Sequence, residues 1–135
     1  MLKVEVLTGA NLPTKAHPSD AGWDLYAHEI SYRENQIIIS TGCKFMIPEG
    51  YYGRIADRSS MAVKGFHVVG GVVDSSYRGI VKVLLVYSGY GMPNIHIGDK
   101  IAQLIVTKIH EGGIEEVASV NETERGEGGF GSSGK

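Results

Sequence analysis

Arg58, Ser59 and Ser60 form a segment that could bind an anion. They open a stretch that tolerates a helix and ends on Lys64 and Gly65, so we expect one or two helical turns with serine hydroxyls as caps. A helix N-terminus offers free backbone N–H groups and partial positive charge, to which a guanidinium and two hydroxyls would add. The alternative is a structural connector with a surface arginine, and spacing alone favours that alternative.

Asp74 lies in a segment, residues 70–79, that joins two strand-like runs and is predicted to be a β-hairpin. Its Asp-Ser-Ser sequence is ordinary turn chemistry, in which the carboxylate accepts hydrogen bonds from nearby backbone N–H groups. Gly70 and Gly71, however, would let a ligand lie against the strand backbone, and Tyr77 offers a face for a ring. The segment therefore predicts either a capped turn or part of a ligand site.

The C-terminal segment is rich in glycine, which makes up five of the nine residues from 126 to 134. Such a tail cannot bury enough apolar surface to offset its ordering entropy, so we expect it to be mobile in the free protein. Its glycines permit close backbone approach to phosphate oxygens, and Arg125 ahead of them supplies positive charge. Phe130 is either incidental or a ring that stacks on a flat partner.

The sequence contains no recognisable metal cage and no pattern typical of a covalent nucleophile. The five histidines are scattered, and none is paired at i, i+4 with a glutamate between. The single cysteine, Cys43, can form no intrachain disulfide and stands in an apolar run, so we expect a buried thiol. The same absences weigh against a zinc deaminase and against acyl-transfer chemistry.

Strands must position these segments, because the apolar periodicity is strand-like along most of the chain. A chain of 135 residues with 42% hydrophobic residues can bury one core, and 19 glycines supply turns. Many short strands with Gly and Pro turns predict a β-barrel or a sandwich. Strands are expected at residues 3–8, 36–39, 45–47 and 80–87, with a possible last strand at 114–117.

Charge and hydropathy limit the expected partners. Thirteen Lys and Arg residues against fifteen Asp and Glu residues give a net charge of −2 without a basic concentration, so no nucleic acid or membrane partner is expected. The N-terminus alternates polar and apolar residues, which argues against a signal peptide or a membrane span. We therefore expect a soluble intracellular protein, in the cytoplasm or nucleus, or in the host cell if the source is a virus.

Five segments, taken in order, resemble the five motifs of the trimeric deoxyuridine triphosphate nucleotidohydrolases (dUTPases). Each motif alone is weak, but together they span nearly the whole chain in the right order and spacing. The segments are residues 21–26 (AGWDLY), 57–62 (DRSSMA), 70–79 (GGVVDSSYRG), 98–104 (GDKIAQL) and 125–134 (RGEGGFGSSG).

The resemblance implies an all-β fold, a distorted jelly-roll or β-clip barrel with one short helix after the second motif and a flexible C-terminal arm. The barrel domain would occupy residues 1–120, and the arm with the fifth motif would occupy residues 121–135. Three subunits would form a homotrimer with active sites at the subunit interfaces.

The resemblance also implies Mg2+-dependent hydrolysis of dUTP to dUMP and pyrophosphate, which limits uracil incorporation into DNA and supplies dUMP for dTMP synthesis. Water would attack the α-phosphorus in line with the departing pyrophosphate, so catalysis is mostly positioning and charge stabilisation. Asp74 would orient and deprotonate the water and touch the sugar 3′-OH. Asp24 would help to hold Mg2+ through water.

The substrate-binding residues follow from the same matches. Tyr77 would lie under the deoxyribose and reject the 2′-OH of UTP, whereas Phe130 would stack on uracil as the arm closes. The residues expected to contact uracil and deoxyribose are Gly71, Val72, Val73, Tyr77 and Phe130, the first three through their backbone. The residues expected to bind phosphates are Arg58, Ser59, Ser60, Gln103, Arg125, Gly131, Ser132 and Ser133.

Four residues depart from the family pattern. Ser60 stands for the usual Gly, Ser76 for the usual second Asp of the third motif, Ser133 for Thr, and Trp23 for the common Tyr or Phe. The first two concern substrate affinity more than the class of reaction. A dCTP deaminase, or a bifunctional deaminase and dUTPase, on the same fold is an alternative, as is a nucleotide-sensing module that binds without turnover.

Overall fold

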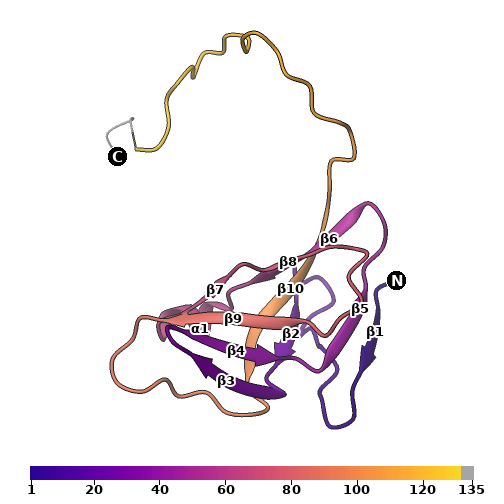
Figure 1. Cartoon of the computed structure of the whole chain (residues 1–135), viewed down its shortest axis with the longest axis vertical. Helices are drawn as coiled ribbons and strands as arrows, with labels where there is room; N and C mark the ends of the chain where they lie inside the picture. Colours follow the sequence, from indigo (N-terminus) through magenta and orange to yellow (C-terminus); the bar gives the residue numbers. More distant parts are fainter. Residues whose placement is uncertain (132–135) are drawn as a thin grey trace.

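The structure is a computed structural model in which antiparallel strands form almost all of the regular secondary structure (Figure 1). It describes residues 1–131 of the 135-residue chain. The described part contains ten strands and one short helix. In chain order these are β1 (Lys3–Val6), β2 (Trp23–Tyr26), β3 (Glu29–Arg33), β4 (Gln36–Ser40), β5 (Cys43–Met46), β6 (Tyr51–Ala56), α1 (Ser59–Val63), β7 (Phe66–Val69), β8 (Val72–Val73), β9 (Lys82–Tyr87) and β10 (Lys100–Lys108).

Two four-stranded sheets and a two-stranded ribbon form the barrel. The first sheet has the order β2-β10-β6-β8, the second has the order β3-β4-β9-β7, and β1 pairs with β5. All of these pairs are antiparallel. The all-β fold with one short helix is therefore confirmed, as are strands near residues 3–8, 36–39, 45–47 and 80–87.

The core is built by the inward face of each strand, because successive side chains of a strand point to opposite faces. On β10, Leu104 is fully buried whereas Gln103 is partly exposed, and Leu25 and Asp24 alternate in the same way on β2. Fully burying one large apolar side chain contributes on the order of 1.5–3 kcal/mol, so these faces hold the sheets together. Other fully buried large side chains are Phe45, Ile39, Leu85, Ile101, Val81 and Val83.

Cys43 is buried, as predicted, and its thiol is free. The Thr41 hydroxyl fixes the neighbouring backbone: it donates a hydrogen bond to the Val81 carbonyl (2.7 Å) and accepts one from the Cys43 N–H (3.2 Å). Burial raises the pKa of the Cys43 thiol, and the hydrogen bond to Thr41 opposes this shift only in part. The thiol therefore acts as a small protonated core side chain.

The helix α1 lies where it is predicted, but its N-terminus is formed differently. Arg58 is the N-cap residue and its side chain makes no capping hydrogen bond, so the predicted capping by serine hydroxyls is wrong. The Ser60 hydroxyl instead accepts a hydrogen bond from the Arg58 guanidinium (3.3 Å). The predicted end of the helix is confirmed, since Lys64 is the C-cap and Gly65 follows with a φ of 98°.

Two further sequence-based predictions of local structure are wrong. Residues 70–79 do not form a hairpin, because β8 pairs with β6 in the first sheet whereas β9 belongs to the second sheet. This segment therefore crosses from one sheet to the other. Residues 114–117 do not form a strand, because within the described part of this chain they pair with no neighbouring strand. Ile114 and Val117 are accordingly exposed.

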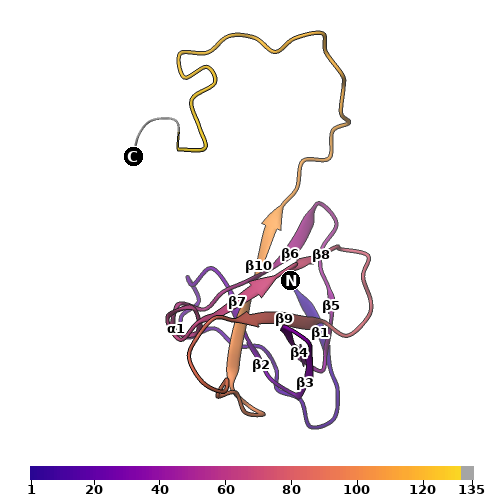
Figure 2. The ribbon, with the colours of Figure 1, turned by 60° about the vertical axis from the view of Figure 1, so that its left-hand side comes forward.

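The chain leaves the barrel after β10. Figures 1 and 2 show residues 109–131 as an extended arm that stands away from the sheets in both views. Residues 109–131 contain turns and bends but no helix or strand. Over residues 1–131, no helix combines the length and apolar character that crossing a membrane requires.

Candidate active site

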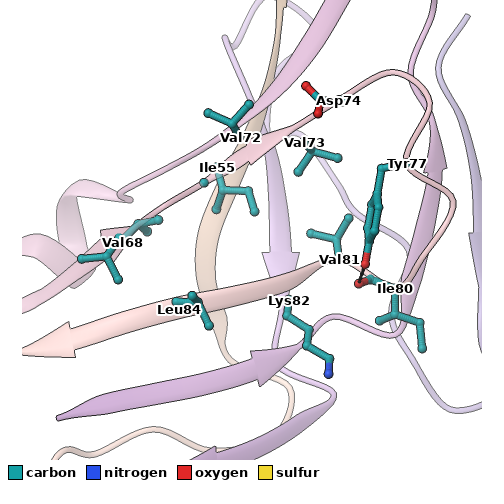
Figure 3. A pocket seen from close by; sticks show the side chains of 12 residues that line it. Ile55, Val68, Val72, Val73, Asp74, Tyr77, Ile80, Val81, Lys82 and Leu84 are labelled. Atoms are coloured by element: carbon teal, nitrogen blue, oxygen red, sulfur yellow. Dashed lines mark hydrogen bonds between the residues drawn. The ribbon is translucent and has the colours of Figure 1, made fainter.

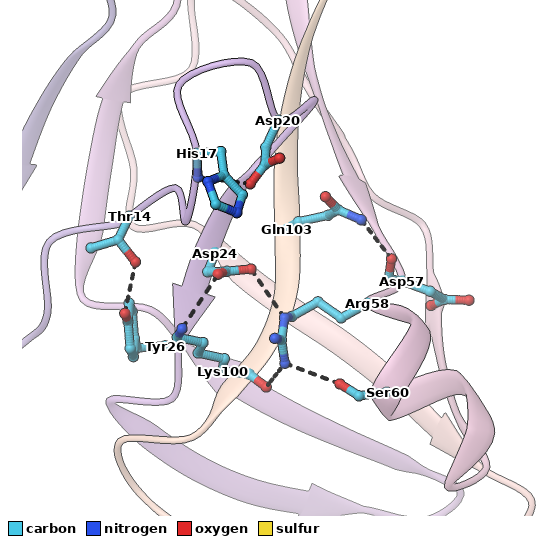
Figure 4. A network of polar contacts seen from close by, with 10 residues as sticks. All are labelled: Thr14, His17, Asp20, Asp24, Tyr26, Asp57, Arg58, Ser60, Lys100 and Gln103. Carbon is cyan, nitrogen blue, oxygen red and sulfur yellow. Dashed lines mark hydrogen bonds and ion pairs between the residues drawn. The ribbon is translucent and has the colours of Figure 1, made fainter.

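A polar cluster lies on the first sheet, where β2 and β10 meet the start of α1 (Figure 4). Arg58 Nε donates a hydrogen bond to Asp24 Oδ1 at 3.0 Å, and Lys100 Nζ lies 3.6 Å from Asp24 Oδ2. The Asp24 and Arg58 side chains are only 18% and 27% exposed, so solvent screens this pair less than a surface ion pair. One carboxylate between two cations leaves a positive charge that suits an anionic ligand.

Arg58 is held in one orientation by further contacts. Its Nη1 donates hydrogen bonds to Ser60 Oγ (3.3 Å) and to the Lys100 carbonyl (3.2 Å). Ser59 stands beside this network in the first turn of α1, with its side chain exposed. A guanidinium has five N–H donors, so after these contacts it still has donors to offer to phosphate oxygens.

Gln103 extends the cluster along β10. Its Nε2 donates a hydrogen bond to the Asp57 carbonyl at 2.9 Å (Figure 4). Gly22 leaves the space that this side chain needs, since a Cβ at residue 22 would lie 2.6 Å from Gln103 Oε1. The structure thus brings Gln103 together with Asp24 and Arg58, which come from separate motif segments.

A cleft of about 430 Å³ opens between the β8 edge of the first sheet and the second sheet (Figure 3). Ile55 lies on one side of it, and Val68 and Leu84 lie on the other. A small apolar cleft with a few polar groups suits a planar ring. The predicted residues that line it are Gly71, Val72, Val73, Asp74 and Tyr77.

Asp74 and Tyr77 belong to the loop beside this cleft. The Tyr77 N–H donates a hydrogen bond to the Asp74 carbonyl (3.1 Å), so the backbone closes the turn. Among residues 1–131, no group donates a hydrogen bond to the Asp74 carboxylate, which therefore does not cap the turn, and Asp74 is exposed. The Tyr77 hydroxyl donates to the Ile80 carbonyl (3.1 Å), which fixes the ring in the cleft (Figure 3).

The polar cluster and the cleft use opposite faces of the first sheet. Gln103 pairs with Asp24 on the outward face, whereas Leu104 pairs with Ile55 on the inward face. The two sites also lie toward opposite edges, β2 and β8. Three interstrand steps of about 4.8 Å separate these edges by roughly 14 Å. A ligand in the cleft therefore does not face the polar cluster of the same chain.

The described residues include no group of three or more His, Cys, Asp or Glu side chains that could enclose a metal ion. Asp24 offers carboxylate oxygens, which suit Mg2+, but each of them already contacts a cation. This donor set fits an ion that is held mainly by the phosphates of a ligand and reaches Asp24 through water.

Within the described residues, the arm does not bring Arg125 or Phe130 to the cluster or the cleft. Arg125 Nε donates a hydrogen bond to the Gly128 carbonyl within the arm (2.6 Å), and Phe130 is fully exposed. Gly131 lies next to Phe130 at the end of the described part. Ser132 and Ser133, which are predicted to bind phosphate, lie outside the described residues.

Lys100 and Asp57 stand within motif segments, but residue type and spacing predict no role for either of them. Lys100 pairs with Asp24 across two strands, and the Asp57 carboxylate accepts a hydrogen bond from the Val68 N–H. Both contacts join residues that are distant in the sequence, so residue type and spacing cannot reveal them. Their membership of the motif segments was the available signal.

Almost the whole chain is similar in sequence to known proteins. A family model described as dUTPase matches residues 8–134, which include all five motif segments. The deoxyuridine 5'-triphosphate nucleotidohydrolase of Monkeypox virus is 43% identical over 128 residues, which cover 93% of this chain and 84% of the relative. The protein of the same name from Vaccinia virus (strain Copenhagen) is also 43% identical, over 93% of this chain and 86% of the relative.

Solved dUTPase structures share the fold. The chain matches Staphylococcus bacteriophage 80alpha dUTPase with dUpNHpp at a TM-score of 0.78 and 25% identity, covering 100% of this chain and 99% of that chain. A dUTPase from phage phi11 of S. aureus matches at a TM-score of 0.76 and 22% identity, over 91% and 99%. A mutant of the phi11 protein, solved to reveal the coordination of a structural Mg(II) ion, matches at 0.74 and 23% identity, over 88% and 97%.

Proposed function

The chain belongs to the dUTPase family and hydrolyses dUTP, and we propose that water attacks the α-phosphorus of dUTP to give dUMP and pyrophosphate. The observation that carries this proposal is the family match over residues 8–134, because it contains all five motif segments. The reaction would limit uracil incorporation into DNA and supply dUMP for dTMP synthesis. We place it inside the cell, where deoxynucleotides are used.

Asp74 is the proposed general base. Its carboxylate lies beside the cleft, is exposed, and accepts no hydrogen bond from the described residues, so a water molecule can donate to it. As the water oxygen bonds to the α-phosphorus, its proton passes to Asp74 and the bridging oxygen leaves with pyrophosphate. The same carboxylate would accept a hydrogen bond from the sugar 3′-OH.

The cleft is the proposed site of uracil and deoxyribose. The Gly71 carbonyl accepts a hydrogen bond from the Ile55 N–H (2.7 Å), which fixes the backbone that leads into β8. Backbone groups of residues 71–73 would then read the uracil edge, and this polar match rejects cytosine more strongly than an apolar pocket could. The Tyr77 ring would lie under the sugar and occupy the space that a 2′-OH needs.

The polar cluster is the proposed site of the phosphates. Arg58 and Gln103 would donate to phosphate oxygens from positions already fixed by Asp24 and the Asp57 carbonyl, and Ser59 and Ser60 would add hydroxyl and backbone donors. The arm would close over the bound nucleotide, with Phe130 on uracil. The arm residues proposed to reach the phosphates are Arg125, Gly131, Ser132 and Ser133.

Mg2+ is the proposed cofactor. Bound mainly by the triphosphate, it would supply positive charge that offsets the negative charge growing on the departing pyrophosphate. Asp24 would contact its water shell, and Lys100 and Arg58 would keep that carboxylate in place. Asp24 is the carboxylate that contacts both Arg58 and Lys100, and a carboxylate already paired in this way suits an outer role.

A homotrimer is the proposed assembly, with each active site shared between subunits. The support is geometric, because the cleft and the polar cluster of one chain use opposite faces of the first sheet. A second copy that brings its cluster to the cleft of the first would complete a site, and closed cyclic symmetry would repeat it three times.

The test is to incubate the purified protein with Mg2+ and dUTP and to measure both products, with Asp74→Asn as the matched control. We expect equal amounts of dUMP and pyrophosphate from the wild-type protein and little from the variant. Release no faster than with Asp74→Asn would contradict the proposal. Ammonia released from dCTP would instead indicate the deaminase activity that the same fold can carry.

A further inference from the structure

Asp57 lies between β6 and α1, immediately before Arg58, and its backbone and side chain make contacts in opposite directions (Figure 4). Its carbonyl faces the polar cluster and accepts the hydrogen bond from Gln103 Nε2 at 2.9 Å. Its carboxylate points away from that cluster. The main chain of Asp57 therefore contacts the polar cluster, whereas its side chain contacts another part of the fold.

The Asp57 carboxylate holds the edge of the second sheet. Its Oδ1 accepts a hydrogen bond from the Val68 N–H at 2.6 Å, a short bond of the charge-assisted kind. Val68 belongs to β7, the edge strand of that sheet, and lines the cleft. The other oxygen, Oδ2, lies 3.8 Å from His67 Nδ1, but both side chains are about half exposed (46% for His67 and 40% for Asp57), so this pair contributes little.

We propose that Asp57 is a positioning residue for dUTP hydrolysis, because it ties the β6–α1 junction, which carries the phosphate-binding Arg58 and contacts Gln103, to β7 at the edge of the second sheet. Without its side chain, the junction between β6 and α1 loses its hydrogen bond to β7 and can shift. A shift of about 1 Å in a group that aligns a reaction can lower the rate by about a hundredfold. This inference rests on the proposed function, since it takes Arg58 and Gln103 as phosphate ligands.

Loss of the Asp57 side chain should mainly affect the binding of the phosphates. β7 keeps its place without Asp57, because Val68 still pairs with Leu85 of β9 and the cleft wall remains in the sheet. The segment that begins α1 has no strand partner of its own, so it is the part that moves. Loss of the bond should therefore weaken contacts to the β- and γ-phosphates and leave the base and sugar site nearly unchanged.

Two variants of Asp57 separate the hydrogen bond from the charge. Asp57→Ala removes the acceptor, and we expect kcat/KM for dUTP to fall about tenfold or more. Asp57→Asn keeps an oxygen that can accept from the Val68 N–H, and we expect kcat/KM within about threefold of the wild-type value. Asp20→Ala is the matched control, because that carboxylate also accepts a backbone N–H (His17, 3.0 Å) without touching Arg58, Gln103 or Val68.

Binding of two ligands distinguishes positioning from a loss of stability. For Asp57→Ala we expect the Kd of the non-hydrolysable analogue dUpNHpp to rise about tenfold and the Kd of dUMP, which lacks the outer phosphates, to stay within about twofold. A merely structural role would lower the melting temperature and the active fraction without changing the ratio of these two Kd values. If Asp57→Ala does not fold, Asp57→Ser provides the same comparison with a side chain too short to reach Val68.

Different results in this experiment would contradict the role of Asp57 and the proposed hydrolysis of dUTP. An unchanged ratio of Kd values in Asp57→Ala, together with normal turnover, would overturn the role of Asp57 and leave dUTP hydrolysis intact. Absence of wild-type turnover would contradict the proposed function, whereas the ratio of Kd values would still measure the effect of Asp57 on phosphate binding. Failure of Asp57→Asn to retain activity would show that the charge, and not the bond to Val68, is what matters.

Discussion

Two carboxylates of the candidate site have contrasting surroundings. Asp24 is mostly buried and lies between Arg58 and Lys100, so its oxygens hold those cations, and under the proposed function they would also contact the water shell of Mg2+. Asp74 is exposed beside the cleft, and within the described residues its carboxylate has no donor. The Asp24 carboxylate is therefore held in place by its ion pairs, whereas the Asp74 carboxylate is free to accept a proton. This contrast is the residue-level reason for assigning the base to Asp74.

Replacing Asp74 by Asn should therefore separate activity from stability. The amide keeps the shape of the side chain but cannot take a proton from water, so we expect kcat to fall by about 10²–10⁴-fold. Since the described residues donate no hydrogen bond to this carboxylate, the melting temperature should change by no more than about 2 °C. Steady-state pyrophosphate release and a thermal melt measure the two quantities. A drop in melting temperature that parallels the loss of activity would mean that Asp74 is a structural turn residue.

At the scale of elements, α1 is a helix of only five residues and cannot be stable alone. Its C-terminal end is fixed by Gly65, whose carbonyl accepts a hydrogen bond from the Ser88 N–H (2.8 Å). Gly65 has a φ of 98°, and a Cβ there would lie 2.7 Å from the Gly89 backbone nitrogen. Both the conformation and the contact therefore require glycine at the end of this helix.

Gly65→Ala should lower the free energy of unfolding by about 1–3 kcal/mol, because the methyl group strains the backbone and collides with Gly89. Gly91→Ala is a matched control: its φ of 71° is also positive, but no atom lies within 4 Å of the added Cβ. We expect about 1 kcal/mol or less for that variant. Urea unfolding measures both, and equal losses would show that the contact with Gly89 is unimportant.

The elements that the sequence predicts correctly are those with local signals. Alternating or apolar runs identify β4 and β9, and the Lys-Gly stop identifies the end of α1. The hairpin at residues 70–79 is predicted wrongly because β8 finds its partner in β6, and a strand partner distant in the sequence leaves no trace in local spacing. The motif segments indicate the candidate site residues, but the link from Asp57 to Val68 depends on how two sheets meet.

The arm is an element without packing of its own in the described part of this chain. Phe130 is fully exposed, and the residues from 109 to 131 form no strand or helix. Deleting residues 125–135 should therefore leave the barrel folded and assembled, with an unchanged melting temperature and sedimentation coefficient. Activity should fall by about a hundredfold or more, since the proposed closure over the nucleotide would position the substrate and exclude bulk water. Normal turnover by the truncated protein would remove Phe130 and Arg125 from the proposed site.

Under the proposed function, a single chain does not contain a complete active site. The polar cluster and the cleft face away from each other across the first sheet, so each needs the complementary half from another copy. In a cyclic trimer, every subunit would give its cluster to one site and its cleft to another. Light scattering of the purified protein should therefore report three subunits, and a monomeric active enzyme would contradict the shared site.

Sharing of this kind predicts that two inactive variants restore activity when they assemble together. Asp74→Asn damages only the cleft half, and Arg58→Ala damages only the cluster half, so each homotrimer should be nearly inactive. In mixed trimers, a site that takes its cluster from an Asp74→Asn subunit and its cleft from an Arg58→Ala subunit is intact. In every trimer that contains both variants one of the three sites is intact, so these mixed trimers should show about one third of the wild-type rate.

The two variants are best co-expressed with different tags, and trimers that carry both tags are then isolated and assayed for pyrophosphate release. The control combines Asp74→Asn with the double variant Asp74→Asn/Arg58→Ala, in which no site has Asp74. Recovery with the first pair and none with the control would establish that the halves come from different chains. Mixed trimers that stay inactive with both pairs would show that each chain supplies both halves of a site. The nucleotide would then have to reach from the cleft to the polar cluster of the same chain, around the β6–α1 junction that contains Asp57.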